Sequence, residues 1–165
     1  MKKILVADPS ATGTTGICIV GSEITLLKFE NKDWKEHFKR IIELVKEHSI
    51  DLIVCETATY ISTTSSDIRK LIGLVGAVQV LPYFFNLKVE TLPSDQTKRL
   101  RKKIINKEKG IAGLNYQRGK SWTYQNENIS VHEVDAFLIY WIWKGNNYES
   151  RNWRKKTDRT LSLRM

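Results

Sequence analysis

The sequence predicts a mixed α/β domain in which three antiparallel strands are followed by parallel strands, with helices on both faces of the sheet. The chain opens with short apolar runs joined by tight turns, which are typical of antiparallel hairpins. Further along, short apolar runs alternate with segments of helical spacing, and strands separated by helices usually pair in parallel. At 165 residues and 41% hydrophobic content, the chain can bury one core.

Three apolar runs at the start of the chain are predicted to form an antiparallel meander; they are residues 3–8, 16–20 and 24–29. The first run ends at Asp8, where a proline marks a turn. From Trp34 the apolar residues fall on one face, so we expect a helix with Asp33 as its N-cap. The histidines His37 and His48 lie on this surface-type helix and are expected to have no chemical role.

The middle of the chain is predicted to alternate strands with helices. Its first strand is wholly apolar, as expected of a strand covered on both faces. Proline ends or kinks the first helix and opens the second. The expected elements are a strand at 52–55, a loop at 57–66, a helix from 67 to about 81, a strand at 87–92 and a helix from 93 to about 105.

The last third is predicted to hold one long loop and one helix. Residues 106–129 contain glycine and asparagine, and we expect a mobile loop. Residues 131–143 are strongly apolar and predict a buried helix, after which a polar and basic tail is expected to become ordered only on DNA. The predicted organisation is therefore a domain of residues 1–145 and a basic C-terminal tail of residues 146–165.

Positive charge is concentrated in two blocks. The chain carries 27 Lys and Arg against 18 Asp and Glu, for a net charge of +9. Residues 144–165 hold seven of the basic residues, and residues 98–120 hold nine with a single acidic one. Aromatic residues are interleaved with both blocks, and this combination favours nucleic acid as the partner, since cations bind phosphates and aromatic rings stack on bases. The candidate DNA-binding residues of the first block are Lys98, Arg99, Arg101, Lys102, Lys103, Lys107, Lys109, Arg118 and Lys120.

The composition also indicates the cellular compartment in which the protein works. No apolar run reaches the length of a membrane helix, and the first run is too short for a signal peptide, so we expect no membrane association. Cys18 and Cys55 each lie within an apolar run and are predicted to be buried, reduced thiols. These features predict an intracellular, cytoplasmic protein that works with DNA.

Several acidic residues at the ends of predicted strands and helices are candidate catalytic or metal-binding residues. Asp8 ends the first strand and Glu56 ends the fourth, so the two would meet if these strands are parallel neighbours. His132 and Asp135 lie three residues apart at the start of the last helix and share one face. Clustered carboxylates repel one another unless cations neutralise them, and oxygen ligands suit Mg²⁺, with Mn²⁺ also accepting an imidazole. Two such ions would support hydrolysis of a phosphodiester.

Each of these residues also has a purely structural interpretation. Asp8 precedes a proline and could simply form a turn. His132 and Glu133 could serve only the N-terminus of a helix, whose dipole favours acids. Asp135 is harder to explain structurally, because an acid against an apolar face needs a partner.

Four groups of residues lie at consistent spacing between residue 3 and about residue 144. They are Ile-Leu-Val-Ala-Asp-Pro-Ser at 4–10 with Thr-Gly at 15–16, Ile-Val-Cys-Glu at 53–56 with Gly at 73 and 76, Leu-Pro at 92–93 before Lys98, and His-Glu-Val-Asp-Ala at 132–136. In this order, the four groups resemble the motifs of the RuvC-type Holliday-junction resolvases.

The resemblance implies a ribonuclease-H-like fold, a homodimer and divalent-metal cleavage of four-way DNA junctions. By position, Asp8, Glu56 and Asp135 match the metal-binding carboxylates of the family. The fourth position is usually acidic and is His132 here, a residue that some members have, with Glu133 as the alternative.

The resemblance also implies DNA contacts. Lys98 and one of Lys107 or Lys109 match DNA-contacting lysines, and Tyr60 lies one residue out of step with an aromatic that stacks at the junction. The glycine-rich stretch between those lysines is replaced by Ile-Ile-Asn-Lys at 104–107, which leaves the DNA sequence preference open. The basic tail is outside the match.

The sequence therefore predicts a Mg²⁺-dependent endonuclease for branched DNA, in which Asp8, Glu56, His132 and Asp135 hold two ions. One alternative is a nuclease of the same fold that acts on single-stranded or RNA-containing substrates. Another is a DNA-binding module without catalysis, in which the acids serve structure. A sugar-kinase or actin type of fold also opens with a strand, an acid and a Gly/Thr-rich turn, but the chain is short for two domains, and no nucleotide cofactor is expected.

Overall fold

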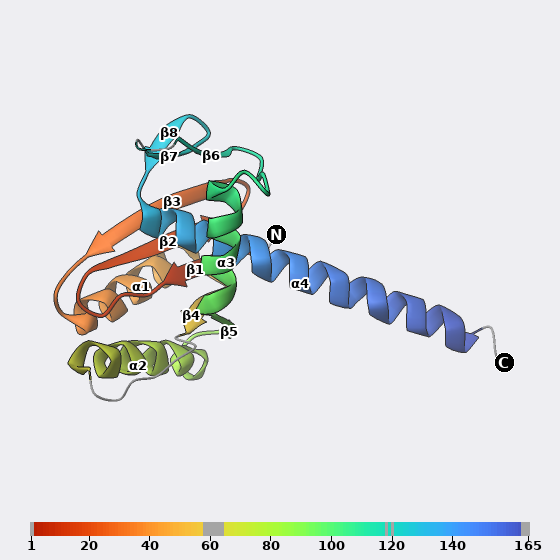
Figure 1. Ribbon diagram of the computed structural model, residues 1–165. Helices are drawn as coiled ribbons and strands as arrows, with labels where there is room; N and C mark the ends of the chain where they lie inside the picture. The colour runs from red at the N-terminus through yellow and green to blue at the C-terminus, as the bar shows by residue number, and fades with distance from the viewer. Residues whose placement is uncertain (1, 58–64, 118, 120, 163–165) are drawn as a thin grey trace.

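The structure is a computed structural model that describes residues 2–57, 65–117, 119 and 121–162, with side chains described as far as residue 147. A five-stranded sheet lies at its centre, in the order β3-β2-β1-β4-β5 (Figure 1). Pairing is antiparallel from β1 to β2 to β3 and parallel from β1 to β4 to β5, which confirms the predicted mixed sheet. The strands are β1 (Ile4–Asp8), β2 (Thr14–Val20), β3 (Ile24–Glu30), β4 (Leu52–Thr57) and β5 (Lys88–Pro93).

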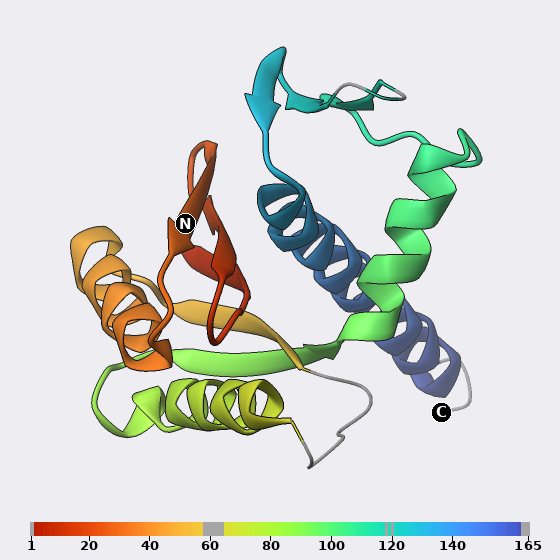
Figure 2. The same cartoon turned by 60° about the vertical axis from the view of Figure 1, so that its left-hand side comes forward.

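Helices cover both faces of this sheet, as predicted. Figure 2 shows α1 and α2 on one side and the first half of α4 on the other, where α3 crosses α4. Side chains alternate along β1, so Leu5 packs towards α1 and α2 while Val6 packs towards α4. The helices are α1 (Trp34–His48), α2 (Ser66–Gln79), the 3₁₀ turn η1 (Leu81–Tyr83), α3 (Ser94–Ile105) and α4 (Val131–Ser162).

Local sequence signals explain several element boundaries. The Asp33 carboxylate accepts a hydrogen bond from the Lys35 amide at 3.0 Å and caps α1. Pro82 lies in η1, directly after α2 ends. Cys18 and Cys55 are both buried and unpaired with each other, as expected.

His37 of α1 has a structural role that its sequence position does not reveal. Its side chain is buried, and Nδ1 lies 2.8 Å from the hydroxyl of Thr15 on β2. Nε2 lies 2.9 Å from the Asn31 carbonyl, so the ring donates there and accepts from Thr15 in its neutral form. The histidine thereby ties α1 to the strand beside β1.

The predicted mobile loop at 106–129 was wrong, because it contains a three-stranded antiparallel sheet. Trp122 is buried there, and Tyr124 packs on Phe137 of α4 with ring centroids 4.9 Å apart. Gln125 and Asn126 both have positive φ and form the two-residue turn between the last two strands, as type I′ hairpins require. The strands are β6 (Leu114–Tyr116), β7 (Trp122–Tyr124) and β8 (Glu127–Ile129).

The last helix is longer than predicted. It does not end near residue 143 but continues to Ser162, and Figure 1 shows its second half extending away from the sheet. A lone glycine at position 145 does not stop it, because an isolated glycine is tolerated within a helix and no proline follows. Within the part of the chain that the structure describes, no helix has the length and apolar character needed to cross a lipid bilayer.

Candidate active site

Two predicted acids meet at one edge of the sheet. β1 and β4 are parallel neighbours, with Ala7 opposite Cys55. Asp8 and Glu56 are the next residues on each strand, so their carboxylates lie side by side where both strands end. This juxtaposition was predicted from the sequence and is confirmed by the strand register.

The first turn of α4 lies across this edge. In β2, Gly16 pairs directly with Asp8, and a Cβ atom built on Gly16 would lie 1.8 Å from the His132 carbonyl oxygen. Only glycine therefore allows the α4 backbone to approach so closely. The approach places His132 Nδ1 at 3.8 Å from the Asp8 carboxylate and brings Asp135 into the same site.

Burial and mutual repulsion make these carboxylates hard to ionise. Burial, followed by the charges of Glu56 and Asp135, raises the pKa of Asp8 to about 8. Burial also raises the pKa of Glu56 and that of Asp135. The site is therefore one where a cation would be favoured, because it would let all three acids ionise together.

Basic residues of α3 partly supply that positive charge. The Arg101 guanidinium forms an ion pair with Asp135 and lowers the pKa of that carboxyl, against the effect of burial. Lys98 is exposed, and its charge lowers the pKa values of both Glu56 and Asp135. Arg101, which the sequence suggested as a DNA contact, forms an ion pair with a candidate metal ligand.

The carboxylate oxygens and the imidazole of the site are ligands that suit a hard divalent cation, although they do not form a complete coordination shell. Among the described residues, no three His, Cys, Asp or Glu side chains converge closely enough to hold one ion. However, Glu56 Oε1 and Asp135 Oδ1 are buried without a hydrogen-bond partner in the described structure. Such orphaned carboxylate oxygens are costly unless a cation or water satisfies them, and oxygen donors are those that Mg²⁺ prefers.

Comparisons with known proteins now place the fold. No protein-family model matches the chain, and no curated protein matches its sequence. Among solved structures, RuvC from Thermus thermophilus in complex with a Holliday junction aligns with a TM-score of 0.55 at 16% identity, over 84% of this chain and 90% of that one. The chain has the RuvC fold.

Two further solved structures share this architecture. The yeast mitochondrial Holliday junction resolvase Ydc2 aligns with a TM-score of 0.52 at 12% identity, over 94% of this chain and 84% of that one. The fowlpox virus Holliday junction resolvase aligns at 0.50 and 15% identity, over 87% of this chain and 99% of that one. The RuvC fold, with its ribonuclease-H-like sheet, is thus the one that the sequence motifs suggested.

Within the RuvC fold of this chain, the two candidates for the fourth metal ligand, His132 and Glu133, make different contacts. Glu133 accepts hydrogen bonds from the Ser130 amide at 2.8 Å and the Ser130 hydroxyl at 2.7 Å, which is a capping box at the start of α4. His132 instead lies beside Asp8 and is partly exposed. The geometry thus favours His132 over Glu133 as the site residue.

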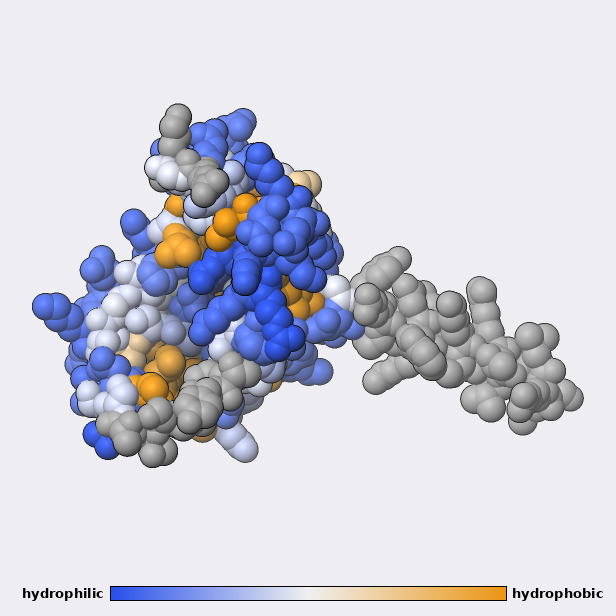
Figure 3. All heavy atoms as spheres, viewed as in Figure 1, coloured by the Kyte–Doolittle hydropathy of each residue, from blue (hydrophilic) through white to orange (hydrophobic). Residues whose placement is uncertain are grey.

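The other predicted DNA-binding residues lie in several places on the RuvC fold. Figure 3 shows mainly hydrophilic residues over α3. Lys102 is exposed there, and Lys107 lines a hollow with Tyr116 below β6. A separate hollow between α3 and α4 is lined by Arg99, Lys103 and Lys109. Tyr60, Arg118 and Lys120 lie outside the described residues.

The sequence did not indicate the roles of two residues, one beside the acid site and one in the hollow between α3 and α4. Gly16 was noted only as part of a motif, although its missing side chain sets the position of α4. Trp141 was counted as part of a buried helix, although it lines the hollow beside Arg99. The helical spacing of Gln96, Arg99 and Lys103 could have indicated a second polar face on α3, since residues three and four apart are neighbours.

Proposed function

We propose that this protein is a metal-dependent, structure-selective endonuclease that cleaves phosphodiester bonds in four-way and other branched DNA junctions. The observation that carries the proposal is the meeting of Asp8, Glu56 and Asp135 at one sheet edge, with their pKa values raised by burial. The RuvC fold supports it, since solved structures of that fold are Holliday junction resolvases.

Asp8, Glu56, Asp135 and His132 would hold the metal, which we expect to be two Mg²⁺ ions, with Mn²⁺ as a substitute. Bound there, the ions would supply a hydroxide nucleophile and stabilise the leaving oxygen. The chain itself orients the ligands through the strand register of β1 and β4 and the close approach at Gly16. Arg101 holds Asp135 and neutralises part of the negative charge.

The basic residues of α3 would supply affinity for the DNA backbone. Lys98 is exposed and its charge acts on both Glu56 and Asp135, so it would contact phosphate beside the scissile bond. The remaining cations extend this basic surface along α3. Binding should therefore be salt-sensitive and should not require metal.

We also propose a homodimer, which would place two sites on opposing strands of a junction. Support comes from exposed apolar side chains in α2 and in the segment after it. Tyr83 is 86% exposed and Phe84 75%, with Val80 and Ile72 also exposed. Light scattering on the wild type and on a Tyr83→Ser, Phe84→Ser double variant tests this proposal. We expect a dimeric wild type and a monomeric variant. A wild type that is monomeric even in the presence of DNA contradicts the proposal.

The nuclease proposal is tested by offering the protein several DNA forms with Mg²⁺. We expect cleavage of a synthetic four-way junction, weaker cleavage of three-way and flap substrates, and none of linear duplex. Preferred cleavage of single strands or RNA–DNA hybrids would instead favour a nuclease of the same fold with another substrate. If every nucleic acid stays intact, the proposal is wrong.

A DNA-binding module without catalysis is distinguished by calorimetry. A nuclease should bind Mn²⁺, and Glu56→Gln should abolish that binding because it removes one charged ligand. A module should bind junction DNA but no metal.

A further inference from the structure

A second polar hollow lies between α3 and α4, apart from the carboxylates. Its volume is about 360 Å³, within the roughly 300–1,000 Å³ typical of small-ligand sites. Its lining residues are Gln96, Arg99, Leu100, Lys103, Lys109, Trp141, Ile142, Gly145 and Asn146, none of which is acidic. A hollow of this size can hold one nucleotide but not a duplex.

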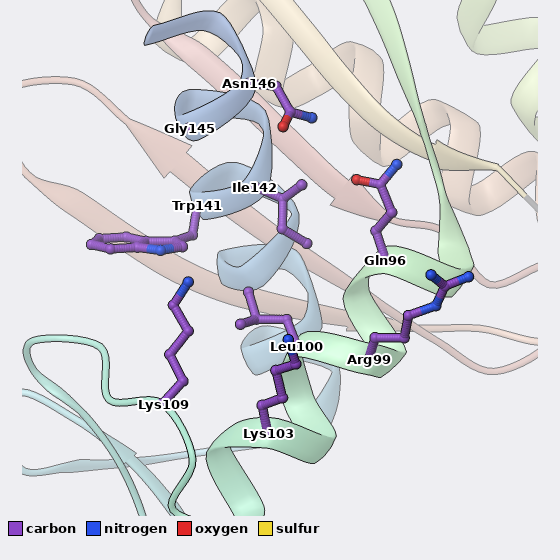
Figure 4. A pocket seen from close by; sticks show the side chains of 9 residues that line it. All are labelled: Gln96, Arg99, Leu100, Lys103, Lys109, Trp141, Ile142, Gly145 and Asn146. Atoms are coloured by element: carbon purple, nitrogen blue, oxygen red, sulfur yellow. The ribbon is translucent and has the colours of Figure 1, made fainter. Parts of the chain in front are cut away.

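The lining divides into cations and an apolar wall. Figure 4 shows the amino group of Lys109 pointing towards the Trp141 ring. In this view Leu100, Ile142 and Lys103 lie in the middle of the hollow, and Arg99 lies on the side opposite Trp141. Arg99 forms an ion pair with Asp95, but its side chain is 76% exposed, and such pairs exchange partners easily. Amides from Gln96 and Asn146 complete a set of groups that can bind a phosphate, a ring face and a base edge.

The hollow is separate from the acid site because of helical spacing. Lys98 and Arg101 are three residues apart and share the face of α3 that looks towards the carboxylates. Gln96, Arg99 and Lys103 share a different face, which looks towards Trp141 on α4. One helix therefore presents cations to two places.

We propose that the α3–α4 hollow is a second DNA subsite, which takes one unpaired nucleotide next to the branch point. Arg99, Lys103 and Lys109 hold its phosphate, and its base lies against Trp141. Aromatic stacking accepts any base, since every base has a π face, so this subsite recognises unpaired structure and not sequence. The proposal deepens the nuclease proposal and rests on it for the branched substrate.

Photocrosslinking tests the subsite without requiring cleavage. A four-way junction with one unpaired 5-iododeoxyuridine at the branch point is bound to metal-free protein, irradiated and mapped by mass spectrometry. We expect the crosslink at Trp141. Trp141→Leu should lose it and should weaken binding of this junction by about ten-fold, while binding of a fully paired junction changes little.

Matched variants control for folding and for charge. Trp143→Leu alters a tryptophan two residues away that donates to Glu90 instead, and it should bind like the wild type. The double variant Lys103→Gln, Lys109→Gln changes two exposed residues and should weaken binding of the junction with the unpaired nucleotide as Trp141→Leu does. Lys102→Gln on the same helix should weaken this binding less.

The outcomes separate the two proposals. A crosslink elsewhere, with unchanged affinity in the Trp141 and lysine variants, overturns the subsite even if the protein cuts junctions. A crosslink at Trp141 in a protein that never cuts DNA upholds the subsite and overturns the nuclease. A wild type that binds no branched DNA overturns both.

Discussion

Two faces of one helix, α3, show how side chains of the same charge serve different ends. On one face, Arg101 is partly buried and paired with Asp135, so its charge is used within the protein. On the other, Lys103 is exposed and lines an open hollow with no acidic wall. The difference is the electrostatic surrounding: the first face compensates buried acids, and the second remains available to a polyanion. Basic residues counted together in the sequence therefore divide into two groups in space.

This comparison separates cutting from binding. The acid edge is negative and buried, and needs cations before it can approach phosphate. The α3–α4 hollow is positively charged without a bound cation, because basic side chains and no acidic ones line it. Substitutions at the acid edge should therefore change metal binding, stability and cleavage, while substitutions at the hollow should change only DNA affinity.

The largest effect on stability is expected from Gly16→Ala. The added Cβ would meet the His132 carbonyl oxygen at 1.8 Å, so the first turn of α4 must move away from β2. We expect a loss of roughly 2–4 kcal/mol in the free energy of unfolding, measured by urea denaturation, together with loss of cleavage.

Gly76→Ala is the matched control, because a Cβ there meets nothing within 4 Å. It should keep or raise stability, since alanine is the better helix former. Equal stability of the Gly16 and Gly76 variants would contradict the close approach that positions the acid site.

The pH dependence of stability comes next. Burial and neighbouring acids raise the pKa of Asp8 from 3.8 to about 8, so between these values the folded protein binds a proton that the unfolded chain does not. Metal-free stability should therefore fall as the pH rises through this window, by about 1–3 kcal/mol, since water reaching the site reduces the full effect. Asp8→Asn should reduce this slope, and the remainder should come from Glu56 and Asp135, whose pKa values are also raised. A wild type whose stability rises with pH there would contradict the repulsion at the acid edge.

A smaller effect is expected on metal affinity from Arg101→Gln. Arg101 competes with a cation for Asp135, so its removal should strengthen Mn²⁺ binding by roughly two- to ten-fold, measured by calorimetry. Lys103→Gln on the other face should leave Mn²⁺ affinity unchanged. If both variants behave alike, the two faces of α3 are not electrostatically distinct.

A further pair of variants separates two neighbours on α4, and its effect on stability is the smallest. Glu133→Ala removes the capping box with Ser130 and should cost about 1 kcal/mol of stability with cleavage retained. His132→Ala should do the reverse, lowering cleavage by roughly 10- to 100-fold with little change in stability. The opposite pattern would make Glu133 the fourth ligand.

The fold and the acid pair could be predicted because their signals are local. Parallel pairing of two apolar strands is enough to bring Asp8 and Glu56 together, and the confirmed register bears this out. The small sheet at β6–β8 was missed because its turn uses Gln125 and Asn126 instead of the usual Asn-Gly. In addition, Trp122 is buried in a core cluster built from segments that are distant in the sequence.

Other features could not be read from the sequence because they depend on contacts between distant segments. Arg101 pairs with Asp135 across 34 positions of sequence, so charge spacing alone made it a DNA contact. His37 lies on a helix with exposed charges but is buried, and it hydrogen-bonds to Thr15 of β2 and to Asn31, which follows β3. In both cases the partner, and not the residue's own neighbours, decides its role.

The central claim is that cutting resides in the acid edge while binding resides in α3. The most direct measurement compares wild type and Asp8→Asn on one four-way junction, for cleavage with Mg²⁺ and for affinity without metal. We predict that Asp8→Asn cuts about a thousand-fold more slowly or not at all, yet binds the junction as tightly as the wild type. Undiminished cleavage by Asp8→Asn, or equal loss of cleavage and binding, would contradict the account.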